Sequence, residues 1–434
     1  MNNKRIVLYS LVLAGLFLFQ PFFQNTIALS HFNEDLLEGG WIEQDGEVTI
    51  LHVSGSHYEM GFQHGYYLSE KVQQNIRAYL SNAPTDLYDL LTIWRTMEPY
   101  IPSQYLEELH GIADGASIPY DNVCLAYTVI IYGDMGCFGL SCWGNVTQNG
   151  NLLHGRSFDL PMDVQDPISG RFVHENHMLI VRNPDQGISS ISPSVAGSTH
   201  GGGGFNKEGV YIGMQVCWSK DQTFDGIPGM IRTQMVLDTA QTTSDAIKIL
   251  TSDRTLGWNY IVSDGDEKIG YAVETTANHY YVGTYDDPVE NTHPFWGIDE
   301  MVRRTNFFIE PTIVSTQRDD FDPSTIPMFI KLLKRDDFFF AIWQSYYAVS
   351  KAFENEYGSY TLSSLMTLFR ESYKGNTNFL LGFIISKAQD TSFNHAWNMW
   401  IVEPSTGDFL VCFADHDTIA YDRPIHQYNM NDFV

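Results

Sequence analysis

Cys137 directly follows Gly136, and this pair has the residue types needed to cleave the chain's own backbone. A thiol reacts as its thiolate, and an unperturbed cysteine has a pKa of about 8.5. A cysteine that becomes the first residue of a chain gains an α-amine with a pKa of about 8, which can accept the thiol proton. Gly136 has no side chain to shield its carbonyl from the adjacent thiol. The pair Gly136-Cys137 thus has the chemistry needed for self-cleavage, with Cys137 as the attacking residue.

Two charged residues, Arg156 and Asp159, follow the turn Asn149-Gly150 on the strand that should return beside Cys137. A guanidinium near the sulfur favours the thiolate and orients a substrate carbonyl. A carboxylate can hold the ammonium group that scission releases. The same spacing also fits a salt bridge at the end of a hairpin, and spacing alone favours that structural role.

Several motifs occur together in a fixed order around this pair. Taken as a set they resemble the N-terminal-nucleophile hydrolases, and among these the penicillin acyltransferase group. Bile-salt hydrolase, acid ceramidase and N-acylethanolamine amidase are similar at a greater distance. The likeness extends from about residue 48 to residue 300. Its motifs are the Gly-Cys pair at 136–137, the loop 144–150, the segment 155–159, the upstream segments 55–65 and 106–115, and the turn 204–210.

The resemblance implies an α+β fold, a four-layer αββα sandwich of two mainly antiparallel sheets. It also implies that Cys137 is the nucleophile, that its released amine is the base, and that Arg156 and Asp159 serve the reaction as described above. No cofactor and no metal are expected. The substrate would be a small molecule with an N-acyl amide bond.

Three more distant residues are candidates for contacts with the substrate. Gln215 falls where relatives carry an asparagine, and its amide is a candidate oxyanion donor. Asn291 stands in a loose match to the group's Thr-Asn-His segment and is a second candidate donor. Arg303 is matched to a late arginine of the group. Phe138 and Ser157 depart from the group's pattern, which leaves the shape of the acyl pocket open.

The function expected from these residues is that of an exported, self-processing enzyme that hydrolyses or transfers an acyl group through an acyl-cysteine. Two alternatives stay open. One is a non-catalytic, exported small-molecule-binding protein with the same fold. It stays open because Phe138 and Gln215 differ from the residues usual in the group. The other is a papain-like cysteine protease that uses Cys142. That chemistry needs a cysteine at a helix N-terminus and a histidine base, whereas a hairpin follows Cys142 and His395 is remote in sequence.

Hydrophobic periodicity and turn residues predict helices before Cys137 and mainly strands after it. Ser103 is expected to cap one helix, and Thr242 to open another. The predicted helices are 58–80, 104–113, 228–240 and 242–250. The predicted strands are 48–53, 210–218, 259–263, 269–275 and 280–285, with a closing hairpin at 397–414.

The N-terminus has the features of a secretory signal. Lys4 and Arg5 precede an apolar run at 6–19, and small residues near Ala28 suit a cleavage site. An uncleaved membrane anchor is the alternative. The expected division is a signal peptide at 1–28, a mainly helical segment at 29–136 that becomes the small subunit, and the hydrolase domain at 137–434. We expect a secreted or otherwise extracytoplasmic protein.

Composition excludes several other classes. The formal charge of −27 disfavours binding to nucleic acid or to an anionic membrane surface.

His174 and His177 lack the HExxH spacing of a zinc site, so a structural role is expected for both. Five cysteines are an odd number and too few for a disulfide scaffold, and their pairing is left open, as is a homo-oligomer.

Overall fold

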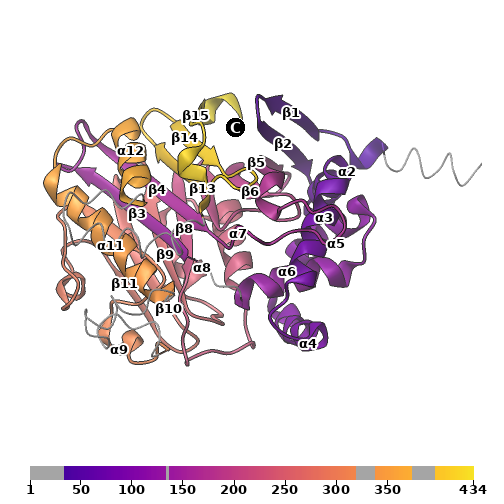
Figure 1. The fold of residues 1–434 in the computed structure, drawn as a ribbon, viewed down its shortest axis with the longest axis horizontal. Helices are drawn as coiled ribbons and strands as arrows, with labels where there is room; N and C mark the ends of the chain where they lie inside the picture. Colours follow the sequence, from indigo (N-terminus) through magenta and orange to yellow (C-terminus); the bar gives the residue numbers. More distant parts are fainter. Residues whose placement is uncertain (1–33, 133–135, 319–337, 374–395) are drawn as a thin grey trace, which may run out of the picture.

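Two β-sheets lie at the centre of the computed structural model, which describes residues 34–132, 136–318, 338–373 and 396–434 (Figure 1). Among the described strand pairs, only β2 with β5 is parallel. The nine-stranded sheet has the spatial order β1 (Trp41–Asp45), β2 (Val48–Gly55), β5 (His177–Pro184), β6 (Ser190–Val195), β7 (Gly203–Asn206), β8 (Val210–Val216), β9 (Trp258–Asp264), β10 (Ile269–Thr275), β11 (Tyr280–Gly283). The six-stranded sheet has the order β12 (Met301–Arg304), β3 (Gly136–Gly144), β4 (Gly150–Asp159), β13 (Ala396–Glu403), β14 (Asp408–Phe413), β15 (His426–Asn429).

Helices cover the outer face of each sheet. On the nine-stranded sheet lie α2 (His57–Tyr67), α7 (Gly229–Thr239) and α8 (Thr243–Leu250), and on the six-stranded sheet lie α11 (Phe338–Asn355) and α12 (Leu362–Tyr373). The remaining α-helices are α3 (Ser69–Ser81), α4 (Leu87–Met97), α5 (Ser103–Ala116), α6 (Tyr120–Tyr132) and α9 (Pro311–Val314). Because β3 packs against β8, β9 and β10, the two sheets face each other. The predicted α+β sandwich, αββα in its layers, is confirmed.

Strand β3 lies between two different environments. Phe138, Leu140 and Cys142 belong to the hydrophobic cluster beneath α11 and α12. The alternate residues point toward the nine-stranded sheet, since side chains on a strand alternate between faces. A Cβ atom added at Gly139, for example, would lie 2.3 Å from Nε2 of Gln215 on β8. Cys137 is therefore on the inter-sheet face, and Cys142 is on the helix-covered face.

Glycines set the close approach of α2 to α5, the two helices that contain the upstream motifs. A Cβ atom at Gly61 would lie 2.1 Å from the carbonyl oxygen of Glu108, and one at Gly111 would lie 2.2 Å from that of Tyr58. Gly65 and Gly115 repeat this arrangement one turn further along. These motifs thus pack two helices backbone to backbone.

Most of the predicted elements are present, with shifts at their ends. Thr242 accepts a hydrogen bond from the backbone N–H of Asp245 and caps α8, as predicted. The predicted helix 58–80 is divided into α2 and α3, because Leu68 leaves helical geometry (φ −114°, ψ 25°). Pro102, rather than Ser103, occupies the cap position of α5. Of the segment 29–136, the described residues 34–132 are largely helical but also supply β1 and β2 to the larger sheet.

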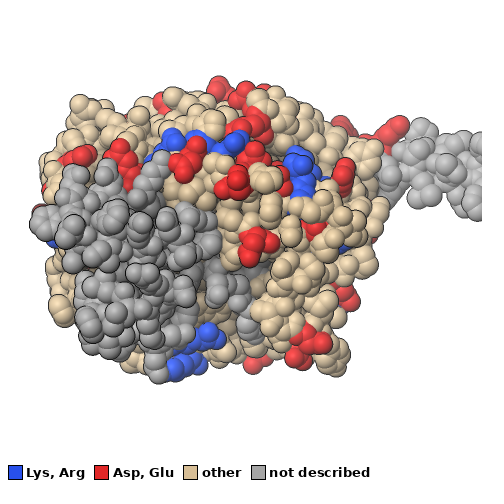
Figure 2. All heavy atoms as spheres, viewed as in Figure 1, with Lys and Arg blue, Asp and Glu red and all other residues tan. Residues whose placement is uncertain are grey.

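Acidic side chains are scattered over the visible face in Figure 2, with a few basic side chains near its upper edge. Within the described ranges, no helix is both long enough and apolar enough to cross a bilayer.

The glycine contact between α2 and α5 gives a stability prediction. Gly111→Ala should lower the free energy of unfolding by about 1–3 kcal/mol or more, because backbone atoms cannot move aside as a side chain can. Glu107→Ala, at an exposed position of the same helix, should change it by less than about 0.5 kcal/mol. Urea unfolding of the two variants measures both values. An equal effect of the two substitutions would contradict the packing argument.

Candidate active site

Cys137 is the second residue of β3, and its side chain is 3% exposed. The register of the hairpin pairs Cys137 with Phe158 and Gly136 with Asp159. The turn that fixes this register has Gly150 in a left-handed conformation (φ +71°), which glycine adopts without strain. The hairpin therefore places the charged residues of β4 next to the predicted scission point.

Arg156 reaches the sulfur of Cys137. Its Nη2 lies 3.5 Å from Cys137 Sγ. The same guanidinium donates to the carbonyl oxygen of Gly201 at 2.7 Å and to that of Met214 at 2.8 and 3.1 Å. A Cβ atom at Gly202 would lie 2.6 Å from Nη2, so a glycine there leaves room for the guanidinium. Carbonyl groups from β8 and from the segment just before β7 thus hold a cation beside the thiol.

The backbone of Cys137 is held by two residues that the sequence motifs did not identify. Asn306 Oδ1 accepts from the backbone N–H of Cys137 at 2.7 Å, and Thr305 Oγ1 donates to the carbonyl oxygen of Cys137 at 2.8 Å. Asn306 Nδ2 donates to the carbonyl oxygen of Val216 at 2.8 Å, which fixes its amide. The sequence signal that could have identified them is the dipeptide Thr305-Asn306, because it has the first two residues of the group's Thr-Asn-His segment. The match predicted for that segment was instead Asn291.

Buried polar contacts position the loop that follows β12. Asn259 Nδ2 donates to the carbonyl oxygens of Thr305 and Phe307 at 2.8 and 2.7 Å. Arg304 forms ion pairs with Glu274 at 2.8 Å and with Glu290 at 2.5 Å, and all three side chains are buried. The position of Asn306 beside Cys137 therefore depends on side chains from β9, β10 and η3 (Pro288–Asn291).

Asp159 lies at the end of β4 opposite Gly136. Since Phe158 shares the face of Cys137, the Asp159 side chain leaves the strand on the other face. Its carboxylate accepts a hydrogen bond from the hydroxyl of Ser157. Asp159 is therefore next to the predicted scission point, but it is not on the same side as the sulfur.

Burial dominates the electrostatics of the Cys137 thiol in the continuous chain. It raises the pKa of Cys137 to about 11, and the charge of Asp159 adds to this, while Arg156 opposes the rise. The nitrogen of Cys137 is an amide in this chain and cannot act as a base. The thiol is thus held in its protonated form before any scission.

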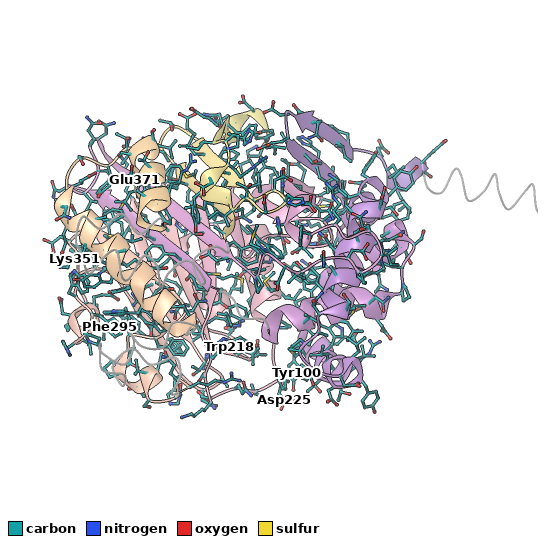
Figure 3. All side chains as sticks on the ribbon, in the orientation of Figure 1. Tyr100, Trp218, Asp225, Phe295, Lys351 and Glu371 are labelled. Atoms are coloured by element: carbon teal, nitrogen blue, oxygen red, sulfur yellow. The ribbon has the colours of Figure 1, made fainter. Side chains whose placement is uncertain are left out.

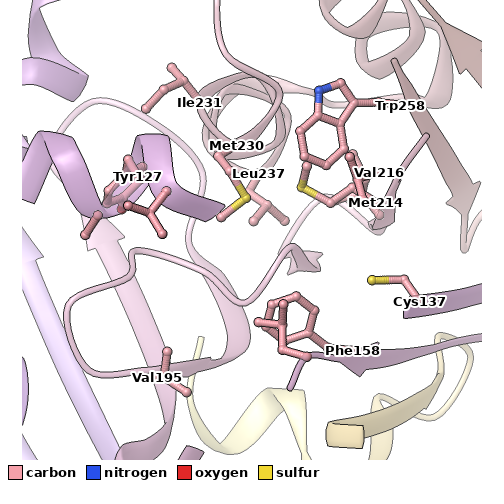
Figure 4. Packing of buried hydrophobic residues seen from close by; sticks show 14 of the residues in the cluster. Tyr127, Cys137, Phe158, Val195, Met214, Val216, Met230, Ile231, Leu237 and Trp258 are labelled. Carbon is pink, nitrogen blue, oxygen red and sulfur yellow. The ribbon is translucent and has the colours of Figure 1, made fainter. Parts of the chain in front are cut away.

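A small cavity adjoins the sulfur, and Figure 4 shows apolar side chains around Cys137. Its volume of about 10 Å³ is close to the space one water molecule needs. The lining is apolar apart from the thiol and one guanidinium, and consists of Cys137, Arg156, Phe158, Gly202, Met214, Val216, Met230 and Trp258. The described chain thus has a site for a small group at the thiol, without room for a large acyl chain.

Gln215, on the inter-sheet face of β8, packs over Gly139, two residues along β3 from Cys137. It is fully buried, and neither its Nε2 nor its Oε1 has a hydrogen-bond partner in the described part of the chain. A buried amide without a partner among these residues, packed over β3 two residues from Cys137, is consistent with the role of an oxyanion donor.

The structure does not bring Asn291 or Arg303 to Cys137. Asn291 is exposed, and its Oδ1 accepts from the backbone N–H of Gly297 at 3.0 Å. Arg303 pairs with Leu140 across β12 and β3, so it shares the helix-covered face of Leu140. Asn306 occupies the place beside the thiol that was assigned to Asn291.

Cys142 does not have the environment of a papain-type nucleophile. It is fully buried in the cluster under α11 and α12, and burial raises its pKa. The five cysteines are all buried and unpaired. Among the described residues, no group of histidine, cysteine and carboxylate side chains has the arrangement of a metal site.

Fold and site together define a class: a sandwich of two mainly antiparallel sheets with a cysteine and an arginine at the start of a central hairpin. Residues 149–325 match the model of the family described as acyl-coenzyme A:6-aminopenicillanic acid acyl-transferase. This match confirms the resemblance to the penicillin acyltransferase group.

The individual proteins that match this chain share a low sequence identity with it. An uncharacterized protein of Archaeoglobus fulgidus is 28% identical over 62% of this chain and 51% of its own length. Protein dcd1A of Dictyostelium discoideum is 21% identical over 58% of this chain and 65% of its own length. The chain thus spans between half and two thirds of the length of these curated relatives.

Solved structures that resemble the chain include a mutant conjugated bile acid hydrolase from Clostridium perfringens and a penicillin V acylase from Agrobacterium tumefaciens. Both are 13% identical over 68% of this chain, and the alignments cover 93% and 86% of those chains. The TM-score is 0.34 in both cases, which is too low to support an argument.

Proposed function

We propose that this chain is a self-processing cysteine amidohydrolase or acyltransferase whose nucleophile is Cys137. The observation that supports this most is the pairing of a buried thiol with a fixed cation, Arg156 Nη2 at 3.5 Å from Cys137 Sγ. Asn306 adds a hydrogen bond to the nitrogen that scission would release.

In the proposed maturation, the thiol of Cys137 adds to the carbonyl carbon of Gly136. The C–N bond breaks, the nitrogen takes up the thiol proton, and a thioester joins the two residues. Water then hydrolyses the thioester, which leaves a carboxylate on Gly136 and restores the thiol. The released α-amine stays beside Asn306 Oδ1, which accepts a hydrogen bond from it.

In the proposed turnover, the α-amine takes the thiol proton and the thiolate attacks the amide carbonyl of the substrate. Arg156 lowers the cost of the negative sulfur, and the amide of Gln215 would donate a hydrogen bond to the developing oxyanion. The α-ammonium returns its proton to the leaving amine. Water or another amine then resolves the acyl-cysteine. The apolar cavity lining favours an uncharged acyl group.

The proposal includes export. The basic residues, apolar run and small residues at 1–28 are those of a secretory signal. Residues 29–136 would then form the small subunit and residues 137–434 the large subunit.

Replacing the nucleophile tests the assignment. Cys137→Ala should leave the chain uncut and inactive toward N-acyl amides, because no thiol remains to attack Gly136 or the substrate. Cys142→Ala should be processed as in the unmodified protein, since Cys142 faces the helices. N-terminal sequencing of the large fragment should begin at Cys137. A Cys137→Ala protein that still hydrolysed amides would falsify the proposal.

Two asparagines can be compared in the same assay. Asn306→Ala removes the acceptor for the Cys137 nitrogen, and should slow both scission and amide turnover by roughly 10- to 100-fold, the effect of losing about 1–3 kcal/mol of hydrogen bonding. Asn291→Ala should leave both rates within about twofold. The opposite ranking would restore Asn291 to the site and remove Asn306 from it.

Scission should depend on pH. With a thiol pKa of about 11, the thiolate fraction at pH 7 is roughly 10⁻⁴ and rises about tenfold per pH unit. The rate of precursor scission should follow that rise between about pH 7 and pH 9, measured on gels after rapid purification. Arg156→Met removes the cation that lowers the pKa and should slow scission throughout. A rate that does not vary with pH would show that thiolate formation does not limit the step.

A further inference from the structure

Arg303 is the centre of a second buried polar cluster, on the opposite face of the six-stranded sheet from Cys137. The cluster consists of Arg303 on β12, Trp296 in the preceding loop, and Tyr346 and Ser350 on α11. Figure 3 labels two residues of this region, Lys351 on α11 and Phe295 in the loop before β12. The proposed amide chemistry uses none of these residues.

The charge of Arg303 has no carboxylate partner in the described part of the chain. Its side chain is fully buried, and its guanidinium donates to two neutral acceptors, Ser350 Oγ at 2.5 Å and the carbonyl oxygen of Trp296 at 2.7 Å. The neighbouring Arg304, by contrast, is paired with Glu274 and Glu290. A buried charge without a counter-charge is costly, so Arg303 requires another source of compensation.

Three buried donors in this cluster lack acceptors. Among the described residues, no acceptor is found for Nη1 of Arg303, the indole Nε1 of Trp296 or the hydroxyl of Tyr346. The Tyr346 oxygen itself interacts with the backbone of Trp296, which acts to lower the pKa of Tyr346 but provides no acceptor for the hydroxyl proton. The Arg303 guanidinium carbon is 4.6 Å from the ring centre of Tyr346 and 5.5 Å from that of Trp296. The two rings are 5.8 Å apart and nearly perpendicular. Burial raises the pKa of Tyr346, so its hydroxyl keeps its proton and remains a donor.

These donors fit an acceptor that carries negative charge and has no proton of its own. We propose that the Arg303 cluster binds a small inorganic anion such as chloride, which neutralises the guanidinium. Lys351 lies on the same side, with its ammonium 4.8 Å from the ring centre of Trp296. The chain as a whole carries a charge of −27, so uptake of an anion here requires a specific local site and not general attraction.

Bromide gives a direct test, because it replaces chloride and scatters anomalously. Crystals of the full chain grown in sodium bromide should show an anomalous peak within about 3.5 Å of Arg303 Nη1, which is hydrogen-bond distance for a halide. A map with no anomalous peak at this place, or with a water only, would overturn the proposal.

Thermal unfolding gives an independent test with a matched control. The melting temperature should rise by about 2 °C for each tenfold increase in chloride, at constant ionic strength balanced with gluconate. Arg303→Met removes both the charge and the need for the anion, so its melting temperature should not respond to chloride. Arg254→Met should keep the response. Arg254 also lies over an aromatic ring, that of Tyr280, but backbone carbonyls accept from its guanidinium.

If Arg303→Met does not fold, variants that each remove one hydrogen-bond donor provide the same test. Tyr346→Phe and Trp296→Phe each remove one donor, and each should shift the chloride dependence to about tenfold higher concentration or more. An unmodified protein whose stability is equal in chloride and gluconate would overturn the proposal. So would single-donor variants with an unchanged response.

Discussion

The contact between the Arg156 guanidinium and the Cys137 sulfur depends on the two sheets facing each other. Arg156 extends from β4 toward the nine-stranded sheet, where the carbonyl oxygens of Gly201 and Met214 accept from it. These carbonyl oxygens hold the guanidinium in place, with its Nη2 3.5 Å from Cys137 Sγ. The sandwich thus provides both the position of the cation and its electrostatic effect.

Three buried arginines of the six-stranded sheet show different solutions to the same physical problem. Arg304 is neutralised by two glutamates and fixes the loop that contains Asn306. Arg156 is held by carbonyl oxygens and meets a group that can become negative. Arg303 donates hydrogen bonds to neutral acceptors, and its Nη1 has no acceptor among the described residues. All three guanidinium groups are buried, and a buried charge needs compensation. Because their partners differ, we assign a structural role to Arg304 and propose functional roles for Arg156 and Arg303.

The sequence was informative where function and structure are local. Cys137 and Arg156 lie on one hairpin, so the turn at Asn149-Gly150 predicted that they are on neighbouring strands, and the resemblance assigned Arg156 to the site. Asn306 could not be found in this way, because it approaches Cys137 only through the pairing of β12 with β3 and the hydrogen bonds of Asn259. A loose motif match selected Asn291 instead. The break at Leu68 was missed because apolar periodicity continues from α2 into α3 although Leu68 leaves helical geometry.

Scission would reverse the electrostatics of the nucleophile. In the continuous chain the thiol has a neutral amide for a neighbour, and burial keeps it protonated, with a pKa of about 11. After scission the same nitrogen becomes an amine that accepts the thiol proton, and the resulting ammonium would lie next to the thiolate, with Arg156 on the other side. Two cations close to one sulfur in a buried site lower its pKa strongly. The burial that keeps the precursor thiol mostly protonated would therefore strengthen these attractions in the mature protein, so that one cleaved bond would make the thiol a better nucleophile toward substrate.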